Sequence, residues 1–177
     1  LIHVILCEAK GLNVERRCFR FFASPCPHPR PHPSITVMPP PPGYHGCYLR
    51  VDLTTRQTET IPLDADVLRR YIGGSGLGTW LLLRESPEEF DALGPEAPLI
   101  FVLSPLVGSP LTTSAKFAVV AKSPLTGRIN DSLASSHFAL AAKKTGHDAL
   151  LIVGHADEPT VLVIEPDGVR FLAAEDT

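Results

Sequence analysis

Short apolar runs divide the chain from residue 44 onward into a series of predicted strands. The stretches CYLRVDL and TETIPL flank TTRQ, and their alternating side-chain character predicts a β-hairpin. Further strands are predicted at PLIFVLSPL, KFAVVAKS, ALLIVGH, TVLVIEP and GVRFLA. The residues EPDG separate the last two runs and predict a second hairpin turn.

Three short helices are predicted between these strands. Asp64 or Asp66 can cap the first, which ends at the glycines that follow Ile72. The second is GLGTWLLLRES, whose apolar residues share one face. Ser135 or Ser136 can cap the third, HFALAAKKTG. Because strands outnumber helices and several are joined by hairpins, the predicted fold class is α+β, with hairpin-linked strands and a few short helices.

Buried strands should meet in a common core. Phe101, Val119, Ile152 and Leu162 each lie at the centre of an apolar run that is long enough to be buried. We therefore expect the strands around these four residues to share one core with Trp80.

The first 42 residues differ in composition from the rest. Nine of the 18 prolines and three of the four cysteines precede Gly43, and the segment SPCPHPRPHPSITVMPPPPG favours solvated, polyproline-like backbone. We predict a disordered leader at residues 1–42 and one folded part at residues 43–177. Met38 is the only methionine, and we interpret it as the true start, with residues 1–37 as upstream sequence translated in frame.

The leader also carries possible metal ligands, namely Cys7, Cys18, Cys26, His28 and His32. Zinc sites usually present paired ligands at short spacings such as CxxC. The cysteines here are separated by ten and seven residues, so the spacing favours a leader without a metal site.

Charge and hydropathy exclude several classes of protein. The formal net charge is −3, which argues against nucleic acid or an anionic membrane surface as a partner. No apolar run approaches the roughly 20 residues of a membrane helix, and the apolar stretch from Val4 to Cys7 is too short for a signal peptide, so we expect none. We expect a cytoplasmic protein.

A glycine-rich stretch, GGSGLG, begins at Gly73. A dinucleotide-binding fingerprint must follow a strand, and a P-loop needs a lysine. Here a helix precedes the glycines and the lysine is missing, so the stretch is better interpreted as a junction between two helices.

Hydroxyl side chains gather around Lys116 in the segments PLVGSPLTTSAK and SPLTGRINDSLASSHF. Hydroxyls, backbone N–H groups and a helix N-terminus can together hold an anion. Ordinary turn and capping chemistry uses the same residue types, so both interpretations stay open. No catalytic constellation accompanies the cluster: no GxSxG motif surrounds Ser132, and Cys47 alone cannot ligate an iron–sulfur cluster.

Taken in order, five stretches resemble the start of the aldehyde ferredoxin oxidoreductase family. They are GCYLRVDLTT, YIGGSGLG, LGPEAPLIFVLSPLVGSPLTT, KFAVVAKSPLTG and KKTGHDALLIVGHADEPTVLVI. Each is weak alone, but together they occur in the order and at the spacing of the family, from about His45 to the end of the chain. The resemblance implies a truncated, β-rich N-terminal base domain.

The resemblance also implies the activity of a larger enzyme. Family members hold tungsten, or rarely molybdenum, between two molybdopterins beside a 4Fe-4S cluster. They oxidise aldehydes to carboxylic acids and pass the electrons to ferredoxin. The cluster cysteines and proton-transfer residues belong to later domains, so the resemblance places no catalytic residue here and implies a fragment that is inactive alone. Whether the enzyme forms a homo-oligomer stays open.

In the family, an arginine and an Asn-Ser-Gly-Gly run contact the pterin phosphates. Lys116 stands at the arginine's place, and Leu133, Ala134, Ser135 and Ser136 replace the run. The resemblance therefore implies cofactor binding by Lys116, Leu133 and Ser135, with the backbone carbonyl of Leu133 as a ligand of the Mg²⁺ that bridges the phosphates. Lysine keeps the charge but loses the planar fork of arginine, and the serines add Cβ atoms where the glycines had none.

Two rival functions remain. One is a non-catalytic relative, either a pterin-carrying scaffold or a remnant that binds nothing. The other is a generic anion-binding module built on the Ser/Thr-rich turns, against which the five ordered stretches count.

Overall fold

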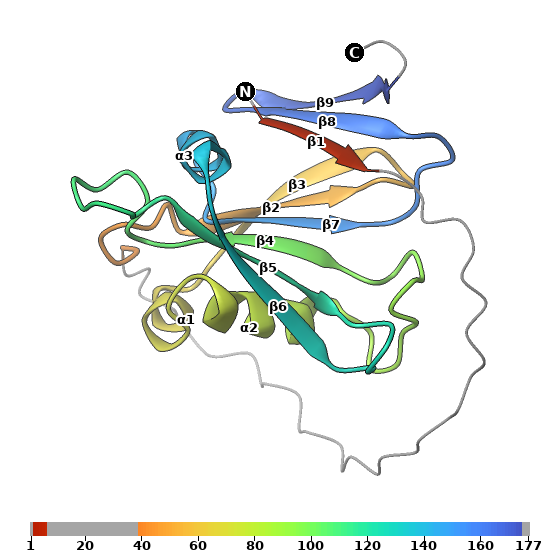
Figure 1. Ribbon diagram of the computed structural model, residues 1–177, viewed down its shortest axis with the longest axis horizontal. Coiled ribbons are helices and arrows are strands. Elements are labelled where there is room, and N and C mark those ends of the chain that lie inside the picture. The colour runs from red at the N-terminus through yellow and green to blue at the C-terminus, as the bar shows by residue number, and fades with distance from the viewer. Residues whose placement is uncertain (1, 7–38, 175–177) are drawn as a thin grey trace.

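A mixed six-stranded sheet forms the centre of the protein, in a computed structural model that describes residues 2–6 and 39–174 (Figure 1). The strand order is β3-β2-β7-β4-β5-β6. Only β2 and β7 pair in parallel; the other neighbours are antiparallel. The strands are β2 (Cys47–Asp52), β3 (Gln57–Pro62), β4 (Leu99–Leu103), β5 (Lys116–Lys122), β6 (Ile129–Ser135) and β7 (Ala149–Val153).

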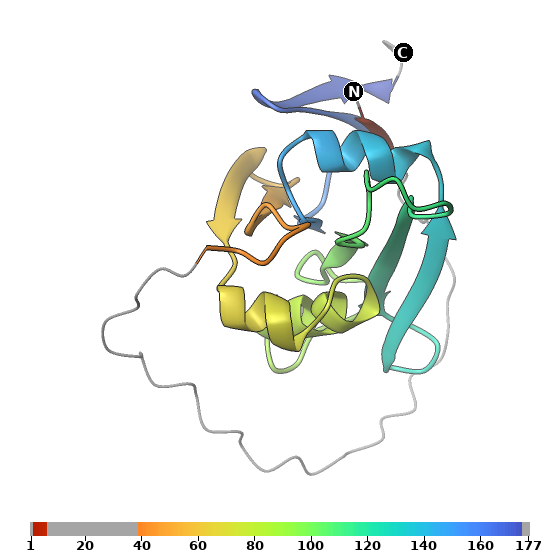
Figure 2. The same ribbon diagram turned by 90° about the vertical axis from the view of Figure 1, so that its left-hand side faces the viewer.

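Two helices, α1 (Ala65–Arg70) and α2 (Ser75–Glu85), cover one face of this sheet (Figures 1 and 2). Asp64 caps α1, as predicted, by accepting a hydrogen bond from the backbone N–H of Asp66. Gly78 brings α2 close to the sheet, since a Cβ at this position would lie 2.5 Å from Cγ2 of Val120. Apolar side chains of both helices and of the sheet form the core on this side.

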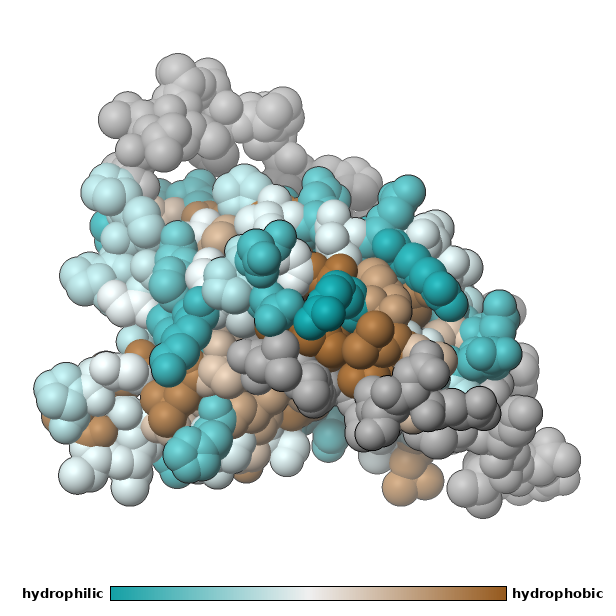
Figure 3. Space-filling view, turned by 90° about the horizontal axis from the view of Figure 1, so that it is seen from above, coloured by the Kyte–Doolittle hydropathy of each residue, from teal (hydrophilic) through white to brown (hydrophobic). Residues whose placement is uncertain are grey.

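The opposite face of the sheet carries α3 (His137–Lys144) and a smaller sheet of order β1-β8-β9 (Figure 1). Its strands are β1 (Ile2–Leu6), β8 (Thr160–Glu165) and β9 (Gly168–Ala173). Leu162 and Ile164 of β8 pack on Leu49, Leu150 and neighbouring residues of the large sheet. Seen from this side, the surface is mixed, with apolar side chains near its centre and hydrophilic ones around them (Figure 3).

The α+β class is confirmed, and each predicted strand and helix is present within three residues of its expected bounds. The single shared core is confirmed for three of the four strands: β4, β5 and β7 contribute buried residues to the cluster against which Trp80 packs, but β8 does not. Trp80 packs on the α1–α2 side, whereas Phe101, Val119, Ile152 and Leu162 belong to clusters on the other face. The sheet separates the two sides because successive residues of a strand point to opposite faces.

The sequence did not predict β6. All seven of its residues are exposed, and it forms an edge of the large sheet beside β5. With neither face buried, the strand has no apolar alternation that could reveal it.

The described part of the predicted leader includes one strand. Residues Ile2–Leu6 form β1 and pair antiparallel with β8, which differs from the disorder expected for these five residues. Residues 7–38 lie outside the described part, so the division into a leader and a folded part stays a prediction.

Candidate functional site

The three predicted site residues lie on adjacent strands at one end of the sheet. Lys116 begins β5 and is the register partner of Ser135, the last residue of β6. Leu133, two residues before Ser135 on β6, pairs with Ala118. Because directly opposed residues share a face and side chains alternate, all three point to the same side of the sheet. All three are exposed, and Leu133 retains 70% of its accessible surface.

The first turn of α3 adjoins this cluster. Ser136 follows β6 directly and caps α3, its Oγ accepting a hydrogen bond from the N–H of Phe138 at 3.2 Å. The N–H of Ser136 in turn donates to the carbonyl of Ala115, next to Lys116. A cation and a hydroxyl thus lie on one face at an exposed edge, and the N-terminus of α3, which packs on the other face, begins two residues after Ser135. Such groups are suited to an anion such as a phosphate.

The glycine-rich stretch is a helix junction, as predicted. Gly74 is the N-cap of α2 and has a φ of +75°, which favours glycine. The N–H of Gly73 donates to the hydroxyl of Tyr44, and a Cβ at Gly73 would lie 2.5 Å from the carbonyl oxygen of Leu103. The glycines at these two positions therefore serve backbone conformation and close packing.

A buried polar network joins the loop before β2 to the start of β7. Asp148, whose side chain is 1% exposed, accepts hydrogen bonds from the N–H groups of His45 and Gly46 and from Nζ of Lys143 at 2.8 Å. Nζ of Lys143 also donates to the carbonyl of Gly43 at 2.7 Å. All of these groups have partners within the network, so it is a structural clamp rather than a site with free ligands.

His147 lies beside this clamp, between two threonines. The hydroxyl of Thr145 donates its only proton to the carbonyl of Ala142, so the 3.2 Å contact with His147 requires Nδ1 of the ring to donate. Nε2 is then the acceptor for the hydroxyl of Thr60. Burial lowers the pKa of His147 below its usual range; nearby His45 lowers it further, and Asp148 acts in the opposite sense.

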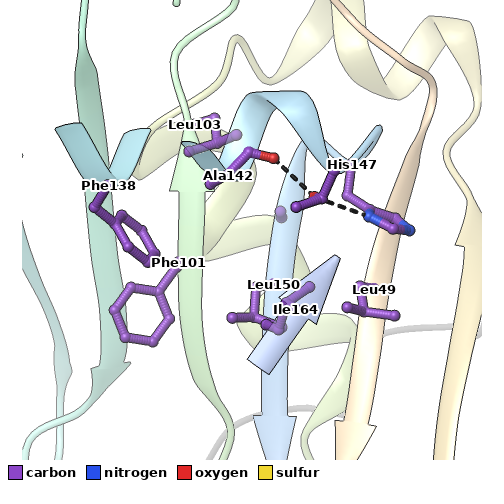
Figure 4. A pocket seen from close by; sticks show the side chains of 10 residues that line it. Leu49, Phe101, Leu103, Phe138, Ala142, His147, Leu150 and Ile164 are labelled. Atoms are coloured by element: carbon purple, nitrogen blue, oxygen red, sulfur yellow. Dashed lines mark hydrogen bonds between the residues drawn. The ribbon is translucent and has the colours of Figure 1, made fainter. Parts of the chain in front are cut away.

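The same histidine borders an apolar pocket between α3, β8 and the large sheet (Figure 4). Its lining includes Leu49, Phe101, Phe138, Leu150 and Ile164, whose side chains surround a gap of about 20 Å³. That volume holds about one water molecule. The pocket is a packing gap and is too small for an organic cofactor.

Metal ligands do not gather in the described part of the chain, where no three His, Cys, Asp or Glu side chains could hold one ion together. The thiol of Cys47 donates to the carbonyl of Gly146, and burial raises its pKa, so it is a poor nucleophile. The candidate zinc ligands of the leader lie outside the described residues. None of the described helices is long and apolar enough to cross a membrane.

The family model for the N-terminal domain of aldehyde ferredoxin oxidoreductase matches residues 48–177. The chain belongs to the aldehyde ferredoxin oxidoreductase family. It is 35% identical, over 129 residues, to a tungsten-containing aldehyde ferredoxin oxidoreductase of Pyrococcus abyssi, and the match covers 73% of this chain.

Two further relatives have other names. One is the WOR-like subunit of an aliphatic sulfonate oxidoreductase from Pyrococcus furiosus, 37% identical over 132 residues, which cover 73% of this chain. The other is a solved structure, the active-site complex BamBC of benzoyl coenzyme A reductase, with 1,5-dienoyl-CoA bound. It matches 76% of this chain and 20% of its own, at 30% identity and a TM-score of 0.72.

The chain spans about a fifth of the length of these relatives, 21% for both Pyrococcus proteins. It therefore corresponds to an N-terminal part of the family's proteins. The structural match also agrees with the predicted fold, a mixed sheet with a few short helices.

Proposed function

We propose that this chain is the cofactor-seating N-terminal part of a cytoplasmic aldehyde ferredoxin oxidoreductase, and that Lys116, Ser135 and Leu133 hold the phosphate end of its pterin cofactor. The observation that carries the proposal is the register of β5 and β6, which brings Lys116 opposite Ser135, with both side chains exposed. Family membership supplies the expected ligand.

The residues present fit a phosphate group. An ammonium and a hydroxyl are both donors, and the N-terminus of α3, where the helix dipole favours negative charge, begins two residues after Ser135. An edge strand such as β6 also leaves alternate backbone carbonyls without a strand partner, and carbonyl oxygens are ligands that Mg²⁺ accepts. Leu133 is the residue whose carbonyl we assign to such an ion.

The cofactor, and not this chain, would supply the redox chemistry. A tungsten or molybdenum bis-molybdopterin would supply two-electron chemistry with an aldehyde, and a 4Fe-4S cluster held by later domains would pass the electrons to ferredoxin. The residues described here would bind and orient the phosphates, so we assign no catalytic residue to the chain.

The test uses the enzyme that contains this chain, purified with its cofactor. Lys116→Ala should lower the tungsten (or molybdenum) and pterin content, because one charge-assisted phosphate contact is worth about 1.5–3 kcal/mol. Lys116→Arg should retain the cofactor, since it keeps the charge and adds a two-pronged donor. Lys144→Ala, at an exposed lysine of α3, is the matched control. Equal cofactor content in Lys116→Ala and Lys144→Ala would refute the assignment.

A second candidate keeps the cofactor seat and changes the substrate. Similarity to the sulfonate oxidoreductase subunit and to BamBC is close to that of the aldehyde enzymes, with identities of 37%, 30% and 35%. Activity of the purified enzyme with aldehydes and ferredoxin would support the first candidate. Turnover only of an aliphatic sulfonate or an aromatic acyl-CoA would support the second.

A further inference from the structure

Few side-chain interactions hold β6 in place. All seven of its residues are exposed, and it pairs with a strand on one side only, through the backbone ladder with β5. An edge strand without buried side chains frays easily, because little apolar surface opposes its opening. Yet this strand carries Leu133 and Ser135 of the proposed phosphate seat.

One side-chain contact ties β6 to another element. The hydroxyl of Ser75 donates to Oδ2 of Asp131 at 2.6 Å, and it is the only side-chain hydrogen bond found for β6 in the described part of the chain. Ser75 is the first residue of α2, whose N-cap, Gly74, has no side chain to accept a hydrogen bond. The carboxylate of Asp131 thus lies at the positive end of α2, where negative charge is favoured.

The register connects this contact with the seat. Asp131 pairs with Val120, Leu133 with Ala118, and Ser135 with Lys116, so the β6 residues of these pairs project from the same face. Successive pairs on one face are separated by about 7 Å, which places Asp131 about 14 Å from Ser135 along the strand. At this distance an exposed carboxylate repels a phosphate only weakly, because the Debye length is about 10 Å at 0.1 M salt. Asp131 can therefore hold the strand without opposing the ligand.

We propose that Ser75 and Asp131 are positioning residues for the phosphate seat: their hydrogen bond fixes β6 against α2 and so keeps Ser135 opposite Lys116. The proposal rests on the proposed function, because it assumes that Lys116 and Ser135 bind phosphate. Neither Ser75 nor Asp131 touches the ligand.

The experiment titrates the chain with inorganic phosphate at constant ionic strength and follows the backbone amide signals of Lys116 and Ser135 by NMR. Ser75→Ala and Asp131→Ala should each raise the apparent dissociation constant for phosphate about fivefold, which is the change expected from the net free energy of one hydrogen bond. Asp131→Asn keeps an acceptor for the Ser75 hydroxyl, so its constant should remain within about twofold of the unmodified chain. Ser132→Ala, on the other face of β6, is the matched control and should change nothing.

Circular dichroism first verifies that each variant is folded, and hydrogen exchange then reports fraying of β6. Faster amide exchange of β6 in Ser75→Ala, with unchanged phosphate binding, would show that the hydrogen bond has only a structural role, and this would overturn the proposal. Weaker binding in Asp131→Asn, equal to that of Asp131→Ala, would also overturn it, since charge alone would then be responsible.

Lys116→Ala separates this inference from the proposed function. If Lys116→Ala weakens phosphate binding while Ser75→Ala does not, only the positioning role fails. If Lys116→Ala binds as the unmodified chain does, or if phosphate causes no shift at either amide, the proposed seat fails and the positioning role fails with it.

Discussion

We expect Asp148→Asn to lower the stability of the fold strongly, although asparagine has nearly the same shape as aspartate. Oδ1 of Asp148 accepts from the N–H of His45 and from Nζ of Lys143, and Oδ2 accepts from the N–H groups of His45 and Gly46. Both oxygens face donors only. An amide NH₂ in place of either oxygen therefore places a donor against a donor, whichever way the side chain is turned.

The magnitude follows from the burial of this clamp. Leaving one buried donor without an acceptor costs about 1–3 kcal/mol, and removal of one partner of a buried ion pair costs about 3–5 kcal/mol. Lys143 is 15% exposed and keeps the carbonyl of Gly43 as an acceptor, so water and that carbonyl offset part of the loss. We expect Asp148→Asn to lower the free energy of unfolding by about 3 kcal/mol.

Urea unfolding followed by circular dichroism measures this change. With a urea dependence of about 2 kcal/mol per molar, the midpoint should fall by about 1.5 M. Asp157→Asn, at an exposed aspartate, is the matched control and should alter stability by less than about 0.5 kcal/mol. If the two variants unfold at the same midpoint, the network around Asp148 does not contribute as argued.

Three further outcomes test the packing, the titration and the capping of the fold. Gly78→Ala should lower the free energy of unfolding, measured in urea, by about 1–3 kcal/mol, because the new Cβ would lie 2.5 Å from Val120. Gly76→Ala is the control and should be neutral or stabilising, since its Cβ would have no packing neighbour nearer than 3.9 Å. Equal effects of the two substitutions would contradict this. Because the pKa of His147 is lowered in the folded state, the unfolded chain binds the proton first as pH falls. The free energy of unfolding should therefore decrease as pH drops below about 6.5, and it should level off below the pKa of the folded state. His147→Gln should flatten this pH profile, and an unchanged slope would contradict the argument. Ser136→Ala should cost about 1 kcal/mol through loss of the α3 cap, and an unchanged urea midpoint would show that the cap contributes nothing.

The elements that the sequence predicted are those with a local physical signal. The β2–β3 hairpin alternates in side-chain character, β7 and β8 are continuous apolar runs, and Asp64 and Ser136 are capping residues at the helix starts that they were expected to mark. Apolar content indicates that a strand is buried, but it does not say which layer covers each face. For this reason the sequence placed β8 in the same core as Trp80, although β8 lies across the sheet from it.

For a similar reason, only part of the candidate site could be predicted from the sequence. Hydroxyl clustering around Lys116 was visible in the sequence, and the family resemblance singled out Leu133 and Ser135, but the register that opposes Lys116 to Ser135 depends on the unpredicted strand β6. The clamp at Asp148 gave no signal at all, because its donors at His45 and Gly46 are more than 100 positions away in the sequence. Contacts of that kind arise from the topology of the sheet and leave no periodic pattern in the chain.

The serines that stand at the end of β6 also bear on the proposed seat. Where the family pattern has glycines, an added Cβ was expected to crowd a ligand. Ser136 has a φ of −163°, an extended conformation that any residue adopts, so the backbone here does not require glycine. Its hydroxyl caps α3, and Ser135 is exposed opposite Lys116. The two serines therefore add a helix cap and a hydroxyl donor at the place where a lysine replaces the forked arginine, which favours a seat that holds phosphate with more hydroxyl contacts and fewer guanidinium contacts.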